Sequence, residues 1–299
     1  MVFSPSVREY SRTKARRGLA IFFTVLVISA AFLEHSASFR SGILGQHFIV
    51  FYMWCVAGSS ILARLILRES TSDVSFRWGG WATTRATLIA TALPLVVGLT
   101  AYGISWSTGL AHFDAAQIPQ TVFKIPIAGS PLVRFCKYLL ISLTLGGLWG
   151  CKSAAGEEIG WRGYMLTRLM DSGFPAPILI SGFIWGIWHI PLIAGGQYLS
   201  VPHSLVSIAV FVADITAAGY VFAWLRLSSG SIWPCVWAHG VWNELLFGPF
   251  DGLTKGGGFW VGEAGLLTTL VVILFAVVLY WFYPLRSYKT ESVLKTKNR

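Results

Sequence analysis

Residues 264–285 read AGLLTTLVVILFAVVLYWFYPL and contain no charged side chain. A helix needs about 20 mostly apolar residues to cross a bilayer, and this run is long enough. We predict eight such segments, at roughly 18–38, 41–63, 86–108, 129–151, 174–196, 204–225, 232–249 and 264–285. The fold class that follows is all-α, a multi-pass transmembrane helical bundle of about eight helices.

The composition supports a membrane protein. Of the 299 residues, 55% are hydrophobic and only 12% are charged, whereas a soluble domain carries about 25% charged residues. A β-barrel would need roughly ten-residue alternating segments, but these apolar runs are longer and continuous. The first helix has no small-residue cleavage site soon after it, so we expect a retained helix. We therefore predict an integral membrane protein, in the plasma (inner) membrane if the source is bacterial.

Basic residues are unequally shared between the two sides of the predicted bundle. Of the 23 Lys and Arg, 18 fall on the side of the two termini and 5 on the other. The positive-inside rule then predicts cytoplasmic termini and places the segment around Glu157 near the cytoplasmic face. Basic residues at membrane ends meet anionic lipid, so the net charge of +10 calls for no nucleic-acid partner.

Two adjacent carboxylates, Glu157 and Glu158, lie in a predicted membrane segment, where an ionisable group is costly and needs a reason. Glu158 and Arg162 are four residues apart on one helix face, so they are expected to pair. Glu157 is rotated by about 100° from that face. A poorly solvated carboxylate that lies near a cation without bonding to it suits a general base. A salt-bridged helix cap is the structural alternative.

His189 follows Trp185 by four residues, so the two rings share a helix face. Pro191 cannot donate to the Ile187 carbonyl, so the helix should kink or end there. A broken helix at membrane depth is tolerated where it meets protein or a water cavity. We therefore expect His189 beside a cavity, although a structural histidine in an aromatic run remains the alternative.

His239 and Asn243 are also four residues apart, and each can donate a hydrogen bond. Two donors on one rigid face suit a developing oxyanion, and the alternative is a polar contact between helices. Asp214 is the remaining deep charge. We expect it to accept a hydrogen bond from a histidine ring, with another polar partner as the alternative.

The three segments together resemble the CPBP family of membrane proteases, which includes the type 2 CAAX prenyl endopeptidases. That family's pattern is Glu-Glu-x-x-x-Arg, an aromatic residue four positions before a His, and His-x-x-x-Asn or Asp. This chain has Glu157 to Arg162, Trp185 to His189 and His239 to Asn243, in that order. The resemblance covers roughly residues 150–250, and Trp185 replaces the usual Phe.

The resemblance implies intramembrane endoproteolysis opening to the cytosol, with a membrane-anchored or prenylated peptide or protein as substrate and membrane lipid as the surroundings. Glu157 and His189 would activate a water, and His239 and Asn243 would stabilise the oxyanion. Glu158 and Arg162 would hold the helix turn of Glu157. No cofactor is expected. The alternative is a zinc ion held by Glu157, His189 and His239, although the spacing His-Glu-x-x-His does not occur.

Two other functions compete with a protease. One is a catalytically silent membrane binding or immunity protein, and the other is an ion- or proton-coupled transporter, in which deep ionisable residues mark a path. No inverted repeat is evident, which counts against the transporter. We divide the chain into N-terminal helices of uncertain role (1–130), a catalytic core (131–255) and a C-terminal helix with a basic tail (256–299).

Overall fold

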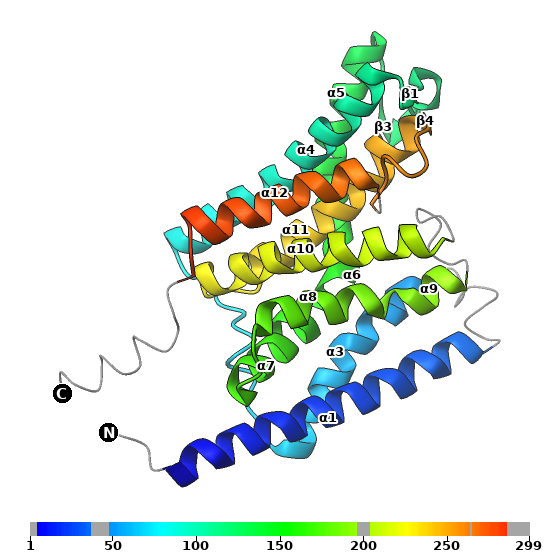
Figure 1. Cartoon of the computed structure of the whole chain (residues 1–299). Helices are drawn as coiled ribbons and strands as arrows, with labels where there is room; N and C mark the ends of the chain where they lie inside the picture. Colours follow the sequence, from blue (N-terminus) through cyan, green and yellow to red (C-terminus); the bar gives the residue numbers. More distant parts are fainter. Residues whose placement is uncertain (1–4, 37–47, 196–203, 264, 286–299) are drawn as a thin grey trace.

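The computed structural model describes residues 5–36, 48–195, 204–263 and 265–285, and most of them are helical (Figure 1). The α-helices are α1 (Pro5–His35), α3 (Phe48–Leu67), α4 (Trp81–Thr108), α5 (Pro131–Ile141), α6 (Gly147–Gly160), α7 (Leu166–Ser172), α8 (Pro177–Trp188), α9 (Ile190–Ala194), α10 (Leu205–Ser229), α11 (Trp233–Leu245) and α12 (Leu266–Phe282). Short π-helical turns are η3 (Ser142–Gly146), η4 (Trp161–Met165) and η5 (Leu246–Phe250), and 3-10 turns are η2 (Ala115–Gln117) and η6 (Asp251–Leu253).

The predicted all-α, multi-pass membrane fold is confirmed. Six helices in the described part of the chain are long and apolar enough to cross a membrane, and α12 is a shorter apolar helix. With α11, they account for the eight predicted segments. The predicted residues 37–38, 41–47, 196 and 264 lie outside the described residues.

The fourth predicted segment is much longer than expected. Helix continues from Pro131 to Ser172, a span of 42 residues, so the predicted end at residue 151 is wrong. No proline interrupts this stretch, and η3 and η4 carry the helix through its two irregular turns. At 1.5 Å per residue the helix is about 63 Å long, and its α5 part projects beyond the neighbouring helices (Figure 1).

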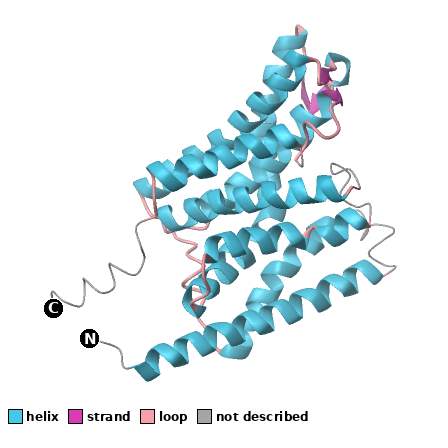
Figure 2. Ribbon diagram, in the orientation of Figure 1, coloured by secondary structure: helices cyan, strands magenta, loops and turns pink. Residues whose placement is uncertain are grey.

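The residues between the third and fourth predicted helices, 109–128, contain short strands. Strand β1 (Ala111–Phe113) pairs antiparallel with β4 (Thr254–Gly256), and β2 (Thr121–Val122) pairs with β3 (Ile125–Pro126). These strands lie together at one corner of the bundle (Figure 2). Strands of two or three residues carry no readable alternation, which explains why the sequence did not predict them.

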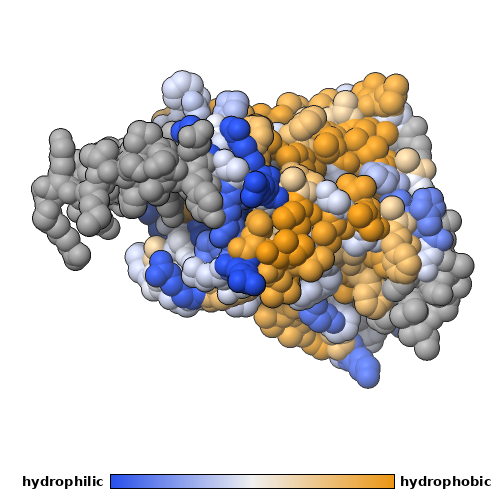
Figure 3. Space-filling model, turned by 90° about the horizontal axis from the view of Figure 1, so that it is seen from below, coloured by the Kyte–Doolittle hydropathy of each residue, from blue (hydrophilic) through white to orange (hydrophobic). Residues whose placement is uncertain are grey.

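The bundle has two ends that differ in charge. At the end we call the basic end, the loop 68–80 meets α7 and the loop before α11. Arg168 pairs with Glu69 at 2.7 Å, and the Ile232 amide donates to the Ser75 carbonyl at 3.1 Å. The first turn of α1 and the last turn of α12 also lie there (Figure 1). The face in Figure 3 shows hydrophilic residues gathered toward this end and apolar residues over the middle.

At the other end, which we call the opposite end, residues 102–137 meet residues 247–266. Trp106 Nε1 donates to Thr254 Oγ1 at 3.0 Å, and the Gly262 amide donates to Tyr102 Oη at 3.1 Å. The strand pair β1–β4 belongs to this end. The two ends define a direction through the bundle against which the depth of any site can be measured.

Glycines bring the motif-bearing helices close together. A Cβ on Gly150 of α6 would lie 2.5 Å from the Gly240 carbonyl oxygen of α11. A Cβ on Gly219 of α10 would lie 2.5 Å from the Gly182 Cα of α8. Small residues that allow such close approach are common where membrane helices pack. This packing places polar side chains of different helices within hydrogen-bonding distance.

Candidate active site

The described residues enclose a cavity of about 300 Å³ at the centre of the bundle. Side chains from α3, α6, α8, α9, α10, α11 and η5 line it, together with His189 between α8 and α9 and Glu263 before α12. They are Ile49, Tyr52, Met53, Glu157, Trp185, His189, Leu192, Ile215, Ala218, Phe222, His239, Trp242, Asn243, Phe247 and Glu263. The four residues that the sequence predicted as catalytic, Glu157, His189, His239 and Asn243, all line this pocket.

Glu157 is almost fully buried and is held by two indole rings. Its Oε2 accepts hydrogen bonds from Trp161 Nε1 at 2.9 Å and from Trp185 Nε1 at 2.5 Å. Trp161 is four residues along the same helix, whereas Trp185 comes from α8. Both donors bond one oxygen, so the carboxylate is fixed in orientation and its Oε1 is available to a small molecule in the pocket.

Glu158 pairs with Arg162, as the spacing predicted, at 2.8 Å. Its Oε1 also lies 2.9 Å from His239 Nδ1 of α11. The Arg162 guanidinium stacks over the rings of Trp185 at 4.1 Å and Phe222 at 5.0 Å. All of these charged groups are buried. The pair therefore connects α6 to the helices that carry the second and third motifs.

His189 occupies the break that Pro191 predicted. Helix α8 ends at Trp188 and α9 begins at Ile190. His189 Nδ1 lies 2.8 Å from the Trp185 carbonyl oxygen. A carbonyl can only accept, so the ring donates from Nδ1 and, when neutral, carries its lone pair on Nε2. This tautomer makes Nε2 the ring atom suited to accept a proton.

His239 has a different hydrogen-bonding role. Its Nδ1 faces the Glu158 carboxylate, which is an acceptor, so the ring donates there. Its Nε2 can donate to a ligand only when the ring is protonated, and the Glu158 carboxylate stabilises that protonated ring by charge. Asn243 lies one turn further along α11 and lines the same pocket. The expected common face of His239 and Asn243 is therefore present.

The hydrogen bonding of Asp214 differs from what the sequence predicted. The residue is fully buried in α10, but neither carboxyl oxygen has a hydrogen-bond partner in the described structure. The expected bond to a histidine ring is therefore absent, and the two ring Nδ1 atoms contact the Trp185 carbonyl and Glu158. It also does not line the pocket.

Sequence reasoning missed three parts of the pocket. Trp161 was part of the first motif, but its bond to Glu157 was not foreseen. Glu263 lines the pocket and accepts from Trp242 Nε1 at 3.0 Å. Tyr52 and Met53 of α3 also line it. Helical spacing could have predicted the Trp161 contact, since Trp161 follows Glu157 by four residues, but nothing in the sequence connects α3 or Glu263 to the motifs.

These additions matter for the division of the chain. The predicted catalytic core covers 131–255, yet Ile49, Tyr52 and Met53 precede it and Glu263 follows it. The pocket is thus completed by the N-terminal helices and by the segment before α12.

A metal centre is not evident in the described part of the chain, where no three His, Cys, Asp or Glu side chains are grouped to hold an ion. Glu157 Oε2 already accepts two indole N–H groups. The zinc alternative is tested below with a chelator.

The fold and the pocket define a class: a multi-pass membrane protein with a buried pocket that carries acidic, histidine and amide side chains. Comparison with known proteins agrees with this class. Residues 139–245 match the family described as Type II CAAX prenyl endopeptidase Rce1-like. Over 82 residues the chain is 35% identical to CAAX prenyl protease 2 of Methanococcus maripaludis, covering 26% of this chain and 30% of that relative. The chain thus aligns with less than a third of the relative's length. The predicted family resemblance is confirmed, and the matched segment holds all three motifs.

Proposed function

We propose that this protein is an intramembrane endopeptidase that hydrolyses a peptide bond in its central pocket. The observation that carries the proposal is the convergence of Glu157, His189, His239 and Asn243 on one cavity. These side chains come from motifs spread over about ninety residues of sequence. A packing role alone would not require them to face a shared cavity.

Glu157 and His189 are proposed to activate the attacking water. The Oε2 atom of Glu157 is held by Trp161 and Trp185, so Oε1 accepts a hydrogen bond from the water. His189 presents Nε2 as a second acceptor, because Nδ1 donates to the Trp185 carbonyl. Two acceptors on one water orient its lone pair and remove its proton as it attacks the carbonyl carbon.

His239 and Asn243 are proposed to stabilise the oxyanion. Attack converts the scissile carbonyl oxygen to an oxyanion, and donors fixed beforehand stabilise that charge most effectively. The protonated His239 ring donates from Nε2 because Glu158 holds Nδ1 at 2.9 Å. The Asn243 amide is the second donor. The proton taken from water then passes to the leaving amine, so the hydrolysis consumes one water and no other reactant.

The chemistry of the pocket wall suggests a membrane-anchored substrate. Apolar side chains, including Met53, Leu192 and Ile215, form much of the lining. Such a wall accepts an apolar peptide side chain or a lipid chain attached to the substrate. A prenylated or otherwise membrane-anchored polypeptide is the proposed substrate, with lipid as the surrounding partner.

The test is cleavage by the purified full-length chain in detergent, with a fluorogenic farnesylated CAAX peptide and a panel of unprenylated membrane peptides. Loss of the general base in Glu157→Ala should reduce kcat by about 10²–10⁴-fold, and loss of one oxyanion donor in Asn243→Ala by about 10²–10³-fold. Glu244→Gln is the matched control, because Glu244 lies beside Asn243 but does not line the pocket. It should cut at the wild-type rate.

The outcomes separate the competing functions. Cutting that depends on Glu157 supports the protease, and the preferred peptide identifies the substrate class. Loss of cutting in chelator, restored by zinc, would favour the metal alternative with Glu157, His189 and His239 as ligands. Equal cutting by wild type and Glu157→Ala would contradict the proposal, and no cutting of any peptide would favour the silent binding protein.

A further inference from the structure

The helix that carries Glu157 and Glu158 changes its winding directly after them. Helix α6 gives way to the π-helical turn η4. The first two residues of η4 are Trp161 and Arg162, whose side chains bond back to the two glutamates. π-Helical turns are rare and frequently lie at functional sites. Because the direction of a side chain follows its backbone, the conformation of η4 determines whether both donors reach the glutamates.

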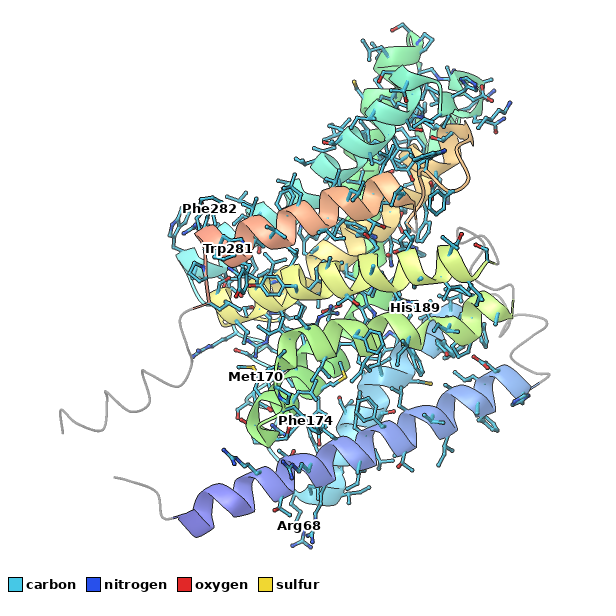
Figure 4. All side chains as sticks on the ribbon, viewed as in Figure 1. Arg68, Met170, Phe174, His189, Trp281 and Phe282 are labelled. Carbon is cyan, nitrogen blue, oxygen red and sulfur yellow. The ribbon has the colours of Figure 1, made fainter. Side chains whose placement is uncertain are left out.

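Arg64 of α3 contacts this turn from outside the pocket. Its Nη2 donates to the Gly163 carbonyl oxygen at 2.9 Å, and its Cζ lies 4.8 Å from the centroid of the Tyr164 ring. Both contacted residues belong to η4, and Arg64 is only 3% exposed. In Figure 4, Arg68, four residues further along the chain, lies well away from His189 of the pocket. Arg64 thus supplies a bond from another helix to a carbonyl of the π-helical turn.

The loop 68–80 holds Arg64 in this position. The Asp73 carboxylate pairs with its Nη1 at 2.6 Å, and the same nitrogen donates to the Ser70 carbonyl. The loop also packs directly on the turn, since a Cβ on Gly163 would lie 3.0 Å from Val74 Cγ1. The loop, the Arg64 guanidinium and η4 therefore form one packed unit at the basic end.

The Trp161 indole connects this unit to the pocket. Its Nε1 donates to Glu157 Oε2 at 2.9 Å. The ring packs edge-on against Phe22 of α1 and against Trp188 of α8, each with centroids 5.9 Å apart, and it is fully buried. In a close-packed interior, a ring confined in this way cannot swing to compensate for a shift of its own backbone. A shift of η4 would therefore move the indole N–H away from Glu157.

We propose that Arg64 is a positioning residue of the hydrolysis: by holding η4, it keeps the Trp161 N–H on Glu157 and so fixes the carboxylate that receives the proton of the water. Arg64 does not line the pocket, so it acts through the turn and not on the substrate. The consequence for catalysis rests on the proposed endopeptidase function. The consequence for the position of the indole does not, and the two are measured separately.

The first test follows the indole itself by nuclear magnetic resonance. The full-length chain is prepared in detergent with isotope-labelled tryptophan, and the Trp161 N–H signal is assigned by its loss in Trp161→Phe. An N–H that donates to a carboxylate resonates at lower field than one that does not. Arg64→Lys keeps the charge but lacks the planar fork that serves several partners at once. In this variant the Trp161 signal should move to higher field and exchange faster with solvent.

Arg168→Lys is the matched control. Arg168 also lies over the Tyr164 ring, at 4.9 Å, and pairs with Asp73 at 3.0 Å, but it is Arg64 that bonds the backbone of the turn. The Trp161 signal of Arg168→Lys should stay at the wild-type position. The proposal is overturned if Arg64→Lys leaves the signal in place, or if both variants move it equally. If Arg64→Lys does not fold, Asp73→Asn, which weakens the anchor of Arg64, takes its place under the same criterion.

The second test is a double-mutant cycle in the cleavage assay. Since a small misplacement of a catalytic group can cost up to about 100-fold in rate, Arg64→Lys should lower kcat by about 10- to 100-fold with KM unchanged. Trp161→Phe should do the same. Because both changes act through one bond, the double variant should stay within about twofold of the worse single variant.

Failure of this proposal and failure of the endopeptidase proposal give different results. Losses of kcat that multiply in the double variant would overturn the role of Arg64, while Glu157-dependent cutting would stand. A wild type that cuts no peptide would count against the endopeptidase, and the indole signal would still decide whether Arg64 holds Trp161 on Glu157.

Discussion

Replacing Glu158 by Gln removes one charge from a fully buried pair without changing its shape. Glu158 and Arg162 are each 1% exposed or less, and their charged atoms are 2.8 Å apart. In the Gln variant the Arg162 charge stays buried without a counter-ion. Breaking a buried pair in this way costs about 3–5 kcal/mol. At about 1.6 °C per kcal/mol for a chain of this size, the melting temperature should fall by about 5–8 °C.

The assay is thermal unfolding of the purified variant in detergent. Unfolding is followed by intrinsic tryptophan fluorescence and by the fraction of protein that stays monodisperse in size-exclusion chromatography. Glu244→Gln removes a half-buried carboxylate of α11 and should shift the melting temperature by about 2 °C or less, because partly solvated charges contribute little to stability. Removing both charges, with Glu158→Met and Arg162→Met together, should cost less than Glu158→Gln alone.

The cleavage assay reports a second consequence. Loss of the Glu158 charge also removes the group that stabilises the protonated ring of His239, 2.9 Å away. Glu158→Gln should therefore lower kcat even at temperatures where it is fully folded. The reasoning is refuted if Glu158→Gln melts no lower than Glu244→Gln, since the pair would then contribute nothing to stability.

Two further predictions concern packing and pH. Gly150→Ala should lower the melting temperature by several degrees and reduce cleavage, because its Cβ would lie 2.5 Å from the Gly240 carbonyl oxygen. Gly58→Ala is the control, and it should melt like wild type because the space around its Cβ is open. Burial raises the pKa of Asp251 to about 6, against a smaller opposing effect of its hydrogen bond from Tyr102. A raised folded-state pKa stabilises at low pH, so this group's contribution is largest below about pH 4 and is lost by about pH 6, by at most about 3 kcal/mol. The free energy of unfolding, measured from pH 4 to 7, should show this loss in wild type and not in Asp251→Asn. Equal dependence on pH in the two proteins would contradict the prediction.

The part of the site that could be predicted from sequence is the part set by helical spacing. Glu158 and Arg162 pair, and Trp185 and His189 share a face, because residues four apart on a helix are neighbours whatever surrounds them. Pro191 ends its helix for an equally local reason. The apolar runs predicted the spans in the same way, since a membrane helix satisfies its own backbone.

The parts that could not be predicted depend on which helices become neighbours. Glu263 faces the pocket only because the segment before α12 is held at Tyr102, more than 150 residues earlier in the chain. Asp214 illustrates the converse error. A buried charge indicates that some partner is needed, but neither carboxyl oxygen of Asp214 has a hydrogen-bond partner in the described structure. Charge counts likewise orient whole helices and do not show how deep a residue lies along a helix of 42 residues.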